Sequence, residues 1–90
     1  MSAPDSLVQE VAAVAREVAG PGRQPSHVDR ETPLTDGFWF DSADLFALVL
    51  ACEARFGVSF ADEDFSPATF ATLGSLADRV HARHRGGDAA

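Results

Sequence analysis

The sequence predicts an all-α protein, a bundle of three main helices and one short helix with a long first loop. Apolar residues recur at helical spacing in three segments, 7–18, 45–56 and 73–80. Glycine follows the first two segments, at Gly20 and Gly57, as it does at many helix ends. The chain has 90 residues, which is enough for one compact core and leaves no room for a second.

The first helix is expected to begin near Ser6, whose side chain would form a capping box with Gln9. Its apolar stripe consists of Leu7, Val11, Val14 and Val18. The glycines and proline of residues 20–22 then end the helix, because neither residue type continues it well.

A long polar connection, about residues 21–40, follows this helix and contains Pro25 and Pro33. Connections of this length without regular structure are uncommon in compact domains, and they tend to be functional or pinned by a few apolar residues. We expect the anchors to be Val28, Leu34 and Phe38.

The second main helix is predicted from Asp41 or Ser42 to Phe56. Its apolar face is formed by Leu45, Leu48, Val49, Cys52 and Phe56. Asp41, Ser42 and Asp44 bring cap-forming oxygens to the first turn, and the two aspartates add negative charge that the helix dipole favours there. Gly57 suits the left-handed conformation that often follows a helix.

A short helix and a brief extended stretch are predicted next. Residues 58–60 have an extended pattern, and residues 62–65 favour a turn of helix that ends before Pro67. The acidic run at residues 62–64 lacks the ligand spacing and the glycine of a calcium loop. We interpret it as a solvated acidic turn.

The last main helix is predicted to start near Thr72, which caps it, and to run through Val80. The domain would then comprise residues 1–85. Residues 86–90 are expected to form a disordered tail, because short polar chain ends with glycine are poorly held.

Charge and cysteine content restrict the partners and the compartment. The net charge is −7, and residues 28–65 hold nine acidic side chains against two arginines. This acidic centre predicts no binding to nucleic acid or anionic membranes. No apolar run approaches the ~20 residues of a membrane span. The single Cys52 leaves no intramolecular disulfide, which fits a cytoplasmic protein, and we expect a monomer.

Two motifs flank the predicted second helix. Residues 41–45 (Asp-Ser-Ala-Asp-Leu) open the helix, and residues 53–60 (Glu-Ala-Arg-Phe-Gly-Val-Ser-Phe) close it. Together with the acidic run at 62–64 and the Thr-Leu-Gly-Ser-Leu sequence at 72–76, this pattern resembles the acyl carrier and peptidyl carrier protein family. The resemblance covers about residues 5–83 and implies an acyl-carrier-like bundle.

The resemblance implies that a phosphopantetheinyl transferase joins 4′-phosphopantetheine from coenzyme A to the Ser42 hydroxyl, while Asp41 helps to seat the transferase's Mg²⁺. A phosphodiester at a helix N-terminus meets free N–H groups and the positive end of the dipole. The arm would carry acyl groups as thioesters, and this chemistry belongs to the cofactor. The implied partners are the transferase, an acyl- or aminoacyl-loading enzyme, and downstream synthase or tailoring enzymes.

The sequence departs from the family pattern around this serine. Ala43 replaces the usual leucine, Trp39 stands where glycine is common, and Ala47 occupies a position that often carries glutamate. These departures suggest docking that relies more on apolar contact than on negative charge. The expected partner-binding residues are Trp39, Phe40, Ala43, Asp44 and Ala47, whereas Phe38 is expected to be buried.

Other interpretations of the polar residues are possible. The alternative interpretation of Ser42 is a helix cap only. A catalytic role is disfavoured because no Gly-x-Ser-x-Gly elbow surrounds it and the histidines lie far away in sequence. His81 and His84 are interpreted as part of a solvated basic helix end and not as metal ligands. Cys52 is interpreted as a small buried hydrophobe. We therefore expect no catalytic residue and no metal site in the chain.

Three functions remain open at this point. The preferred one is a free-standing, non-catalytic acyl carrier in polyketide or other specialised metabolism. The first alternative is an aminoacyl or peptidyl carrier of a nonribosomal peptide pathway, because both kinds of carrier share this bundle. The second alternative is an unmodified carrier-like module that only docks its partners.

Overall fold

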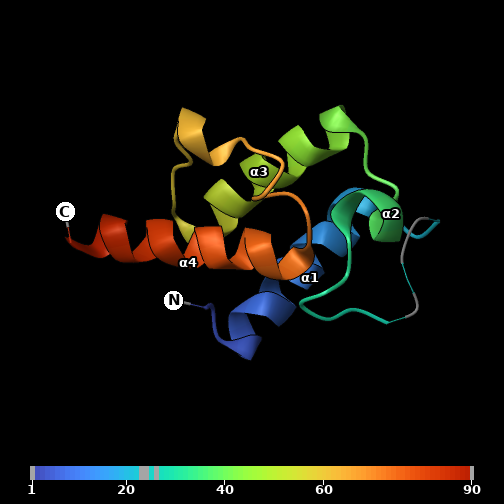
Figure 1. Cartoon of the computed structure of the whole chain (residues 1–90), viewed down its shortest axis with the longest axis horizontal. Helices are drawn as coiled ribbons and strands as arrows, with labels where there is room; N and C mark the ends of the chain where they lie inside the picture. Colours follow the sequence, from blue (N-terminus) through green and yellow to red (C-terminus); the bar gives the residue numbers. More distant parts are fainter. Residues whose placement is uncertain (1, 23–24, 26, 90) are drawn as a thin grey trace.

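The computed structural model describes residues 2–22, 25 and 27–89 and is all-helical over them, with no strand (Figure 1). The elements in chain order are α1 (Asp5–Ala19), α2 (Leu34–Phe38), α3 (Ser42–Phe56), the 3-10 helix η1 (Asp62–Asp64) and α4 (Leu73–Ala89). The predicted all-α bundle is confirmed, with η1 as the short helix. The five-residue α2, inside the predicted long first loop, was not predicted.

Helix α1 packs against both α3 and α4, and the core lies where the three meet. Its largest fully buried apolar side chains are Phe38, Leu34, Leu48, Leu73, Leu76, Val8, Val11, Val49 and Val80. In Figure 1, α3 and the segment between α3 and α4 lie on the same side of α4. That arrangement places α3 opposite residues 65–71, where the candidate site is found.

The N-cap of helix α1 lies two residues before the predicted Ser6, and the helix has no side-chain cap. Pro4 is its N-cap residue, and the Pro4 carbonyl accepts from the N–H groups of Leu7 (3.0 Å) and Val8 (3.1 Å). The predicted capping box of Ser6 and Gln9 is therefore wrong, because Ser6 already lies inside the helix. Proline suits this position, since its ring fixes φ near the observed −67°, and with ψ at 157° the residue has the extended backbone typical of an N-cap.

The predicted C-terminal end of α3 and the predicted N-terminal cap of α4 are confirmed. Gly57 follows α3 in the left-handed conformation, at φ 67° and ψ 35°. Thr72 caps α4: its hydroxyl accepts from the Ser75 N–H (3.1 Å), and the Ser75 hydroxyl accepts from the Thr72 N–H (3.0 Å). This reciprocal pair satisfies two backbone donors that a helix start leaves free.

The long first loop is pinned by the three predicted anchors. Val28, Leu34 and Phe38 are all buried, and the last two are the ends of α2. Leu34 and Phe38 stand four residues apart, so a single helical turn after Pro33 turns both side chains toward the core. A helical turn is favoured here because it places both apolar side chains on the face of α2 that packs into the core.

The loop also completes the N-terminus of α4. The carbonyl groups of Thr32 and Arg30 accept from the N–H groups of Leu73 (2.8 Å) and Gly74 (2.9 Å). Position 74 is glycine because a Cβ there would lie 2.9 Å from the Arg30 carbonyl oxygen. The Arg30 guanidinium reaches on to Asp78 on α4, with 2.7 Å between Nη2 and Oδ2.

The acidic turn at η1 differs from the prediction of a solvated turn, because one of its three acids is buried. Asp64 is fully buried, and its carboxylate accepts two hydrogen bonds from Arg83, at 2.6 and 2.9 Å. It also accepts from the Ala61 N–H at 2.8 Å and lies 3.2 Å from the Arg79 guanidinium. The hydrogen bonds from Arg83 contribute most to lowering the pKa of Asp64. Arg79 and Arg83 of α4 thus bind η1 to that helix.

Cys52 is buried, as predicted, and burial together with the neighbouring Glu53 charge raises its pKa to about 12. Helix α4 continues through residues 86–89, where the sequence predicts a disordered tail. Residue 90 of that tail lies outside the described residues, and the domain boundary at residue 85 stays a prediction. Among the described residues, no helix is long and apolar enough to cross a membrane.

Candidate functional site

The N-terminus of α3 is organised by two aspartates that flank Ser42. The Asp41 carboxylate accepts from the Asp44 N–H at 2.9 Å, and the Asp44 carboxylate accepts from the Asp41 N–H at 3.2 Å. This capping box starts the helix with the acids favoured near the positive end of its dipole. Ser42 is the first residue of α3 and is exposed, and the cap does not use its hydroxyl.

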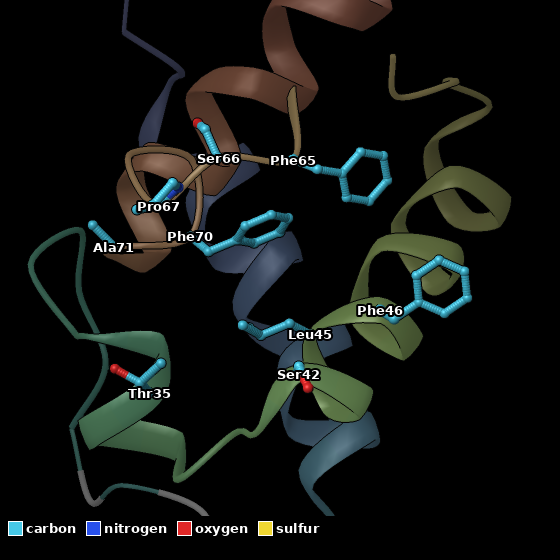
Figure 2. A pocket seen from close by; sticks show the side chains of 9 residues that line it. All are labelled: Thr35, Ser42, Leu45, Phe46, Phe65, Ser66, Pro67, Phe70 and Ala71. Carbon is cyan, nitrogen blue, oxygen red and sulfur yellow. The ribbon is translucent and has the colours of Figure 1, made fainter. Parts of the chain in front are cut away.

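An apolar groove of about 510 Å³ begins beside Ser42 (Figure 2). One wall is α3, with Ser42, Leu45 and Phe46, and the opposite wall is the segment of residues 65–71. Thr35 of α2 lies at the Ser42 end of the groove. The lining residues are Thr35, Ser42, Leu45, Phe46, Phe65, Ser66, Pro67, Phe70 and Ala71. None of these nine side chains is ionisable.

Hydrogen bonds hold the 65–71 wall in place. The Ser66 hydroxyl bonds the Thr69 hydroxyl at 3.2 Å, and the Thr69 carbonyl accepts from the Ser75 hydroxyl of α4 at 2.8 Å. At the other end of the wall, Asp64 joins η1 to α4 through Arg83. The wall is therefore fixed to α4 on both sides, while α3 faces it across the groove.

Large exposed apolar side chains gather on and next to α3. Trp39, Phe46 and Leu50 are 68%, 57% and 50% exposed. Ala43 and Ala47 are exposed on the same helix, and the Asp44 side chain is half-buried. We call Trp39, Ala43, Phe46, Ala47 and Leu50 the α3 apolar residues. An exposed apolar set of this kind is typical of an interaction surface.

Phe40 is not available for such a surface. Its side chain is 4% exposed and stacks on buried Phe38, with 5.3 Å between ring centroids. The expectation that Phe40 contacts a partner is corrected accordingly: the stacking pair packs into the core and leaves Trp39 on the outside. Among the described residues, no group of three or more potential ligands is placed to hold a metal ion.

The comparison with protein families assigns this chain. The family described as the phosphopantetheine attachment site matches residues 7–80. The chain belongs to this family. No curated protein and no solved structure matches it significantly.

This carrier domain thus bears a covalently attached 4′-phosphopantetheine arm, and domains of its kind interact with phosphopantetheinyl transferases and acyl-handling enzymes. The described site fits the group. An exposed hydroxyl stands at a helix N-terminus, its neighbours form the cap, and an apolar groove starts alongside. When bound, the arm supplies a terminal thiol that carries acyl groups as thioesters.

Sequence reasoning did not find the groove of the carrier domain. Phe65, Pro67 and Phe70 lie in a segment with no periodic pattern, so nothing indicated that they face α3. Phe46 gave a usable signal, because Phe46 and Leu50 are large apolar residues four apart and lie off the predicted core stripe. A second apolar face on α3 was therefore predictable, but its facing wall was not.

Proposed function

We propose that Ser42 receives the arm and that the chain is a free-standing acyl carrier in polyketide or other specialised metabolism. The supporting observation is the exposed Ser42 hydroxyl on the first turn of α3, beside the apolar groove. In this modification the Ser42 oxygen displaces adenosine 3′,5′-bisphosphate from coenzyme A and forms a phosphodiester. The hydroxyl proton passes to a base of the transferase.

Asp41 has two roles in this proposal. Its carboxylate caps α3, and it helps to seat the Mg²⁺ of the transferase beside the attacking hydroxyl. Its exposure and its position next to Ser42 support the second role. The helix N-terminus then favours the phosphodiester that forms, since the first backbone N–H groups and the dipole both attract anions.

The uncharged groove favours an acyl cargo over an aminoacyl one. An aminoacyl thioester carries an ammonium group, and burying that charge among side chains without a carboxylate is unfavourable. An apolar acyl group meets Leu45, Phe46 and Phe70 instead. A nonribosomal carrier remains the alternative, and the loading enzyme distinguishes the two: an acyl-loading enzyme should charge the modified protein, and an aminoacyl-adenylating enzyme should not.

The α3 apolar residues are the proposed contact surface for the transferase and loading enzymes. Trp39, Ala43 and Ala47 are exposed beside Ser42, and Asp44 adds negative charge at the edge. Burial of large aromatic side chains often dominates such interfaces. Trp39→Ala should therefore weaken the affinity for a cognate enzyme, with unchanged circular dichroism. Unchanged affinity would remove Trp39 from the surface.

Intact mass spectrometry tests the attachment. The unmodified protein, coenzyme A and a broad-specificity transferase should give a quantitative mass gain of one phosphopantetheine. Ser42→Ala should abolish the gain, and Ser59→Ala, another exposed serine, should retain it. No mass gain in the wild type would favour a docking module instead, and a gain that survives Ser42→Ala would place the arm elsewhere.

We also propose that the carrier works as a monomer in the cytoplasm. The free, buried Cys52 supports this, because it needs no oxidising compartment and offers no accessible thiol for a disulfide between chains. Sedimentation of the purified protein and fractionation of the producing cells test the two statements separately.

A further inference from the structure

Three phenylalanine side chains border the groove beside Ser42. Phe46 belongs to α3, and Phe65 and Phe70 belong to the facing segment (Figure 2). Phe65 and Phe70 contact each other at a tilt, with 6.2 Å between ring centroids. Phe65 also contacts the ring of Phe60, which lies outside the groove lining, at 6.3 Å. One wall of the groove thus presents two aromatic rings in contact with each other.

The opposing aromatic side chain is not paired with that row. Within the described part of the chain, no ring contact joins Phe46 to Phe65 or Phe70. Phe46 and Phe65 are 57% and 45% exposed, so both rings keep an open face or edge. The groove is therefore a slot with aromatic groups on both walls and no ring between them.

The slot offers little to a polar or charged group. Its hydroxyl groups come from Thr35, Ser42 and Ser66, and the Ser66 hydroxyl already bonds Thr69. A cargo that ends in a carboxylate would lose its hydration there without gaining a cation. An uncharged cargo does not lose the hydration of a charged group, so the lining selects against charged acyl groups.

We propose that the groove prefers an uncharged, ring-bearing acyl group to a straight-chain one of similar length, with Phe46, Phe65 and Phe70 as the residues that determine this preference. The inference rests on the proposed attachment at Ser42. An aromatic ring gains offset or edge-to-face contacts beyond its area burial. A straight chain gains only the area term and loses more rotational freedom on entering the slot.

The experiment compares two cargoes on the same protein. A broad-specificity transferase installs the acylated arm directly, from 3-phenylpropanoyl-coenzyme A or hexanoyl-coenzyme A. Cleavage of each thioester by hydroxylamine is then measured and divided by the rate for the same coenzyme A thioester free in solution. We expect about three- to tenfold more protection for the phenylpropanoyl group, the range that one or two aromatic contacts give.

Variants connect the preference to the rings. Phe46→Leu and Phe65→Leu change half-exposed side chains and should keep the fold, which circular dichroism checks, but should reduce the preference to about twofold or less. Phe56→Leu, on α3 but outside the groove, is the matched control and should retain the full preference.

The outcomes separate this inference from the proposed function. Equal protection of both cargoes, better protection of hexanoyl, or a preference that survives Phe46→Leu and Phe65→Leu would overturn the inference and leave the attachment standing. If no acylated arm appears in the intact mass, the attachment at Ser42 fails, and the cargo preference fails with it.

Discussion

Trp39 has a left-handed backbone at φ 61°, the one such non-glycine residue among those described. It ends α2, and this conformation turns the chain from α2 toward the start of α3. A side chain in the left-handed region is unfavourable by about 1–2 kcal/mol. Glycine adopts this conformation without that penalty, whereas Trp39 combines a strained backbone with an exposed indole.

Replacing Trp39 by Gly or by Ala separates this strain from the loss of the indole. Both variants lack the ring, so the difference between them reports on the backbone alone. We expect Trp39→Gly to be more stable than Trp39→Ala by about 1 kcal/mol, the reverse of the order at an ordinary helical position. Urea unfolding measures the difference, and an alanine variant of equal or greater stability would contradict it.

Asp41 permits a similar separation of cap from charge. Asparagine caps a helix about as well as aspartate, so Asp41→Asn should change the unfolding free energy by less than about 0.5 kcal/mol. Loss of the carboxylate should nevertheless slow phosphopantetheinylation by about tenfold or more, if it supports the transferase's Mg²⁺. Asp62→Asn, which removes an exposed acid of η1, is the control. Equal rates for both variants would leave Asp41 with its capping role only.

At the scale of elements, the first loop and α4 depend on close backbone contact. Gly74→Ala would bring a Cβ within 2.9 Å of the Arg30 carbonyl oxygen and within 2.9 Å of its Cβ. We expect a destabilisation of about 1–3 kcal/mol, because the loop must move off the helix start. Gly22→Ala meets nothing within 4 Å and should be nearly neutral. Thermal unfolding of the two variants tests this, and equal melting temperatures would contradict it.

The contact of η1 with α4 depends on one buried carboxylate. Asp64→Asn removes the charge that Arg83 and Arg79 face and should destabilise the protein by about 3 kcal/mol at neutral pH. Asp62→Asn, which changes an exposed acid of the same turn, should have little effect. Urea unfolding at pH 7 measures both, and equal stabilities would contradict the prediction.

Acid should affect the same contact. The pKa of Asp64 lies below its ordinary value in the folded state, chiefly because Arg83 hydrogen-bonds the carboxylate. This contribution is present above the unfolded pKa of about 3.9 and is lost as the pH falls through the folded value. The stability gap between wild type and Asp64→Asn should therefore narrow below about pH 4. A constant gap from pH 7 to pH 2 would contradict the assignment.

At the scale of the whole molecule, the sequence predicted the parts that repeat. The stripes of α1, α3 and α4 extend over several turns, so periodicity identified them. Helix α2 has one turn and two buried apolar residues, and a segment of this length is too short to show a helical repeat in the sequence. The burial of Asp64 was missed because its partner Arg83 is 19 residues away, and charge runs are usually solvated. The groove was missed for the same reason: its two walls meet only in the folded chain.

The end of α4 gives a prediction for the whole molecule. Val80 of this helix is fully buried in the core, and Arg83 hydrogen-bonds Asp64 of η1. A chain ending at residue 85 should therefore melt within about 2 °C of the full chain, since it keeps both of these residues. Fast amide exchange at residues 86–89 would support the predicted tail, and a clear loss of stability on truncation would contradict it.

The aspartates on either side of Ser42 have one more consequence. Because they start α3 by bonding each other, the helix does not depend on the serine hydroxyl, and an arm attached there would remove nothing that the fold requires. Synthesis and activation are then separable in time. If the arm is attached at Ser42, a cell can accumulate the folded protein without it and add the arm in a single later step.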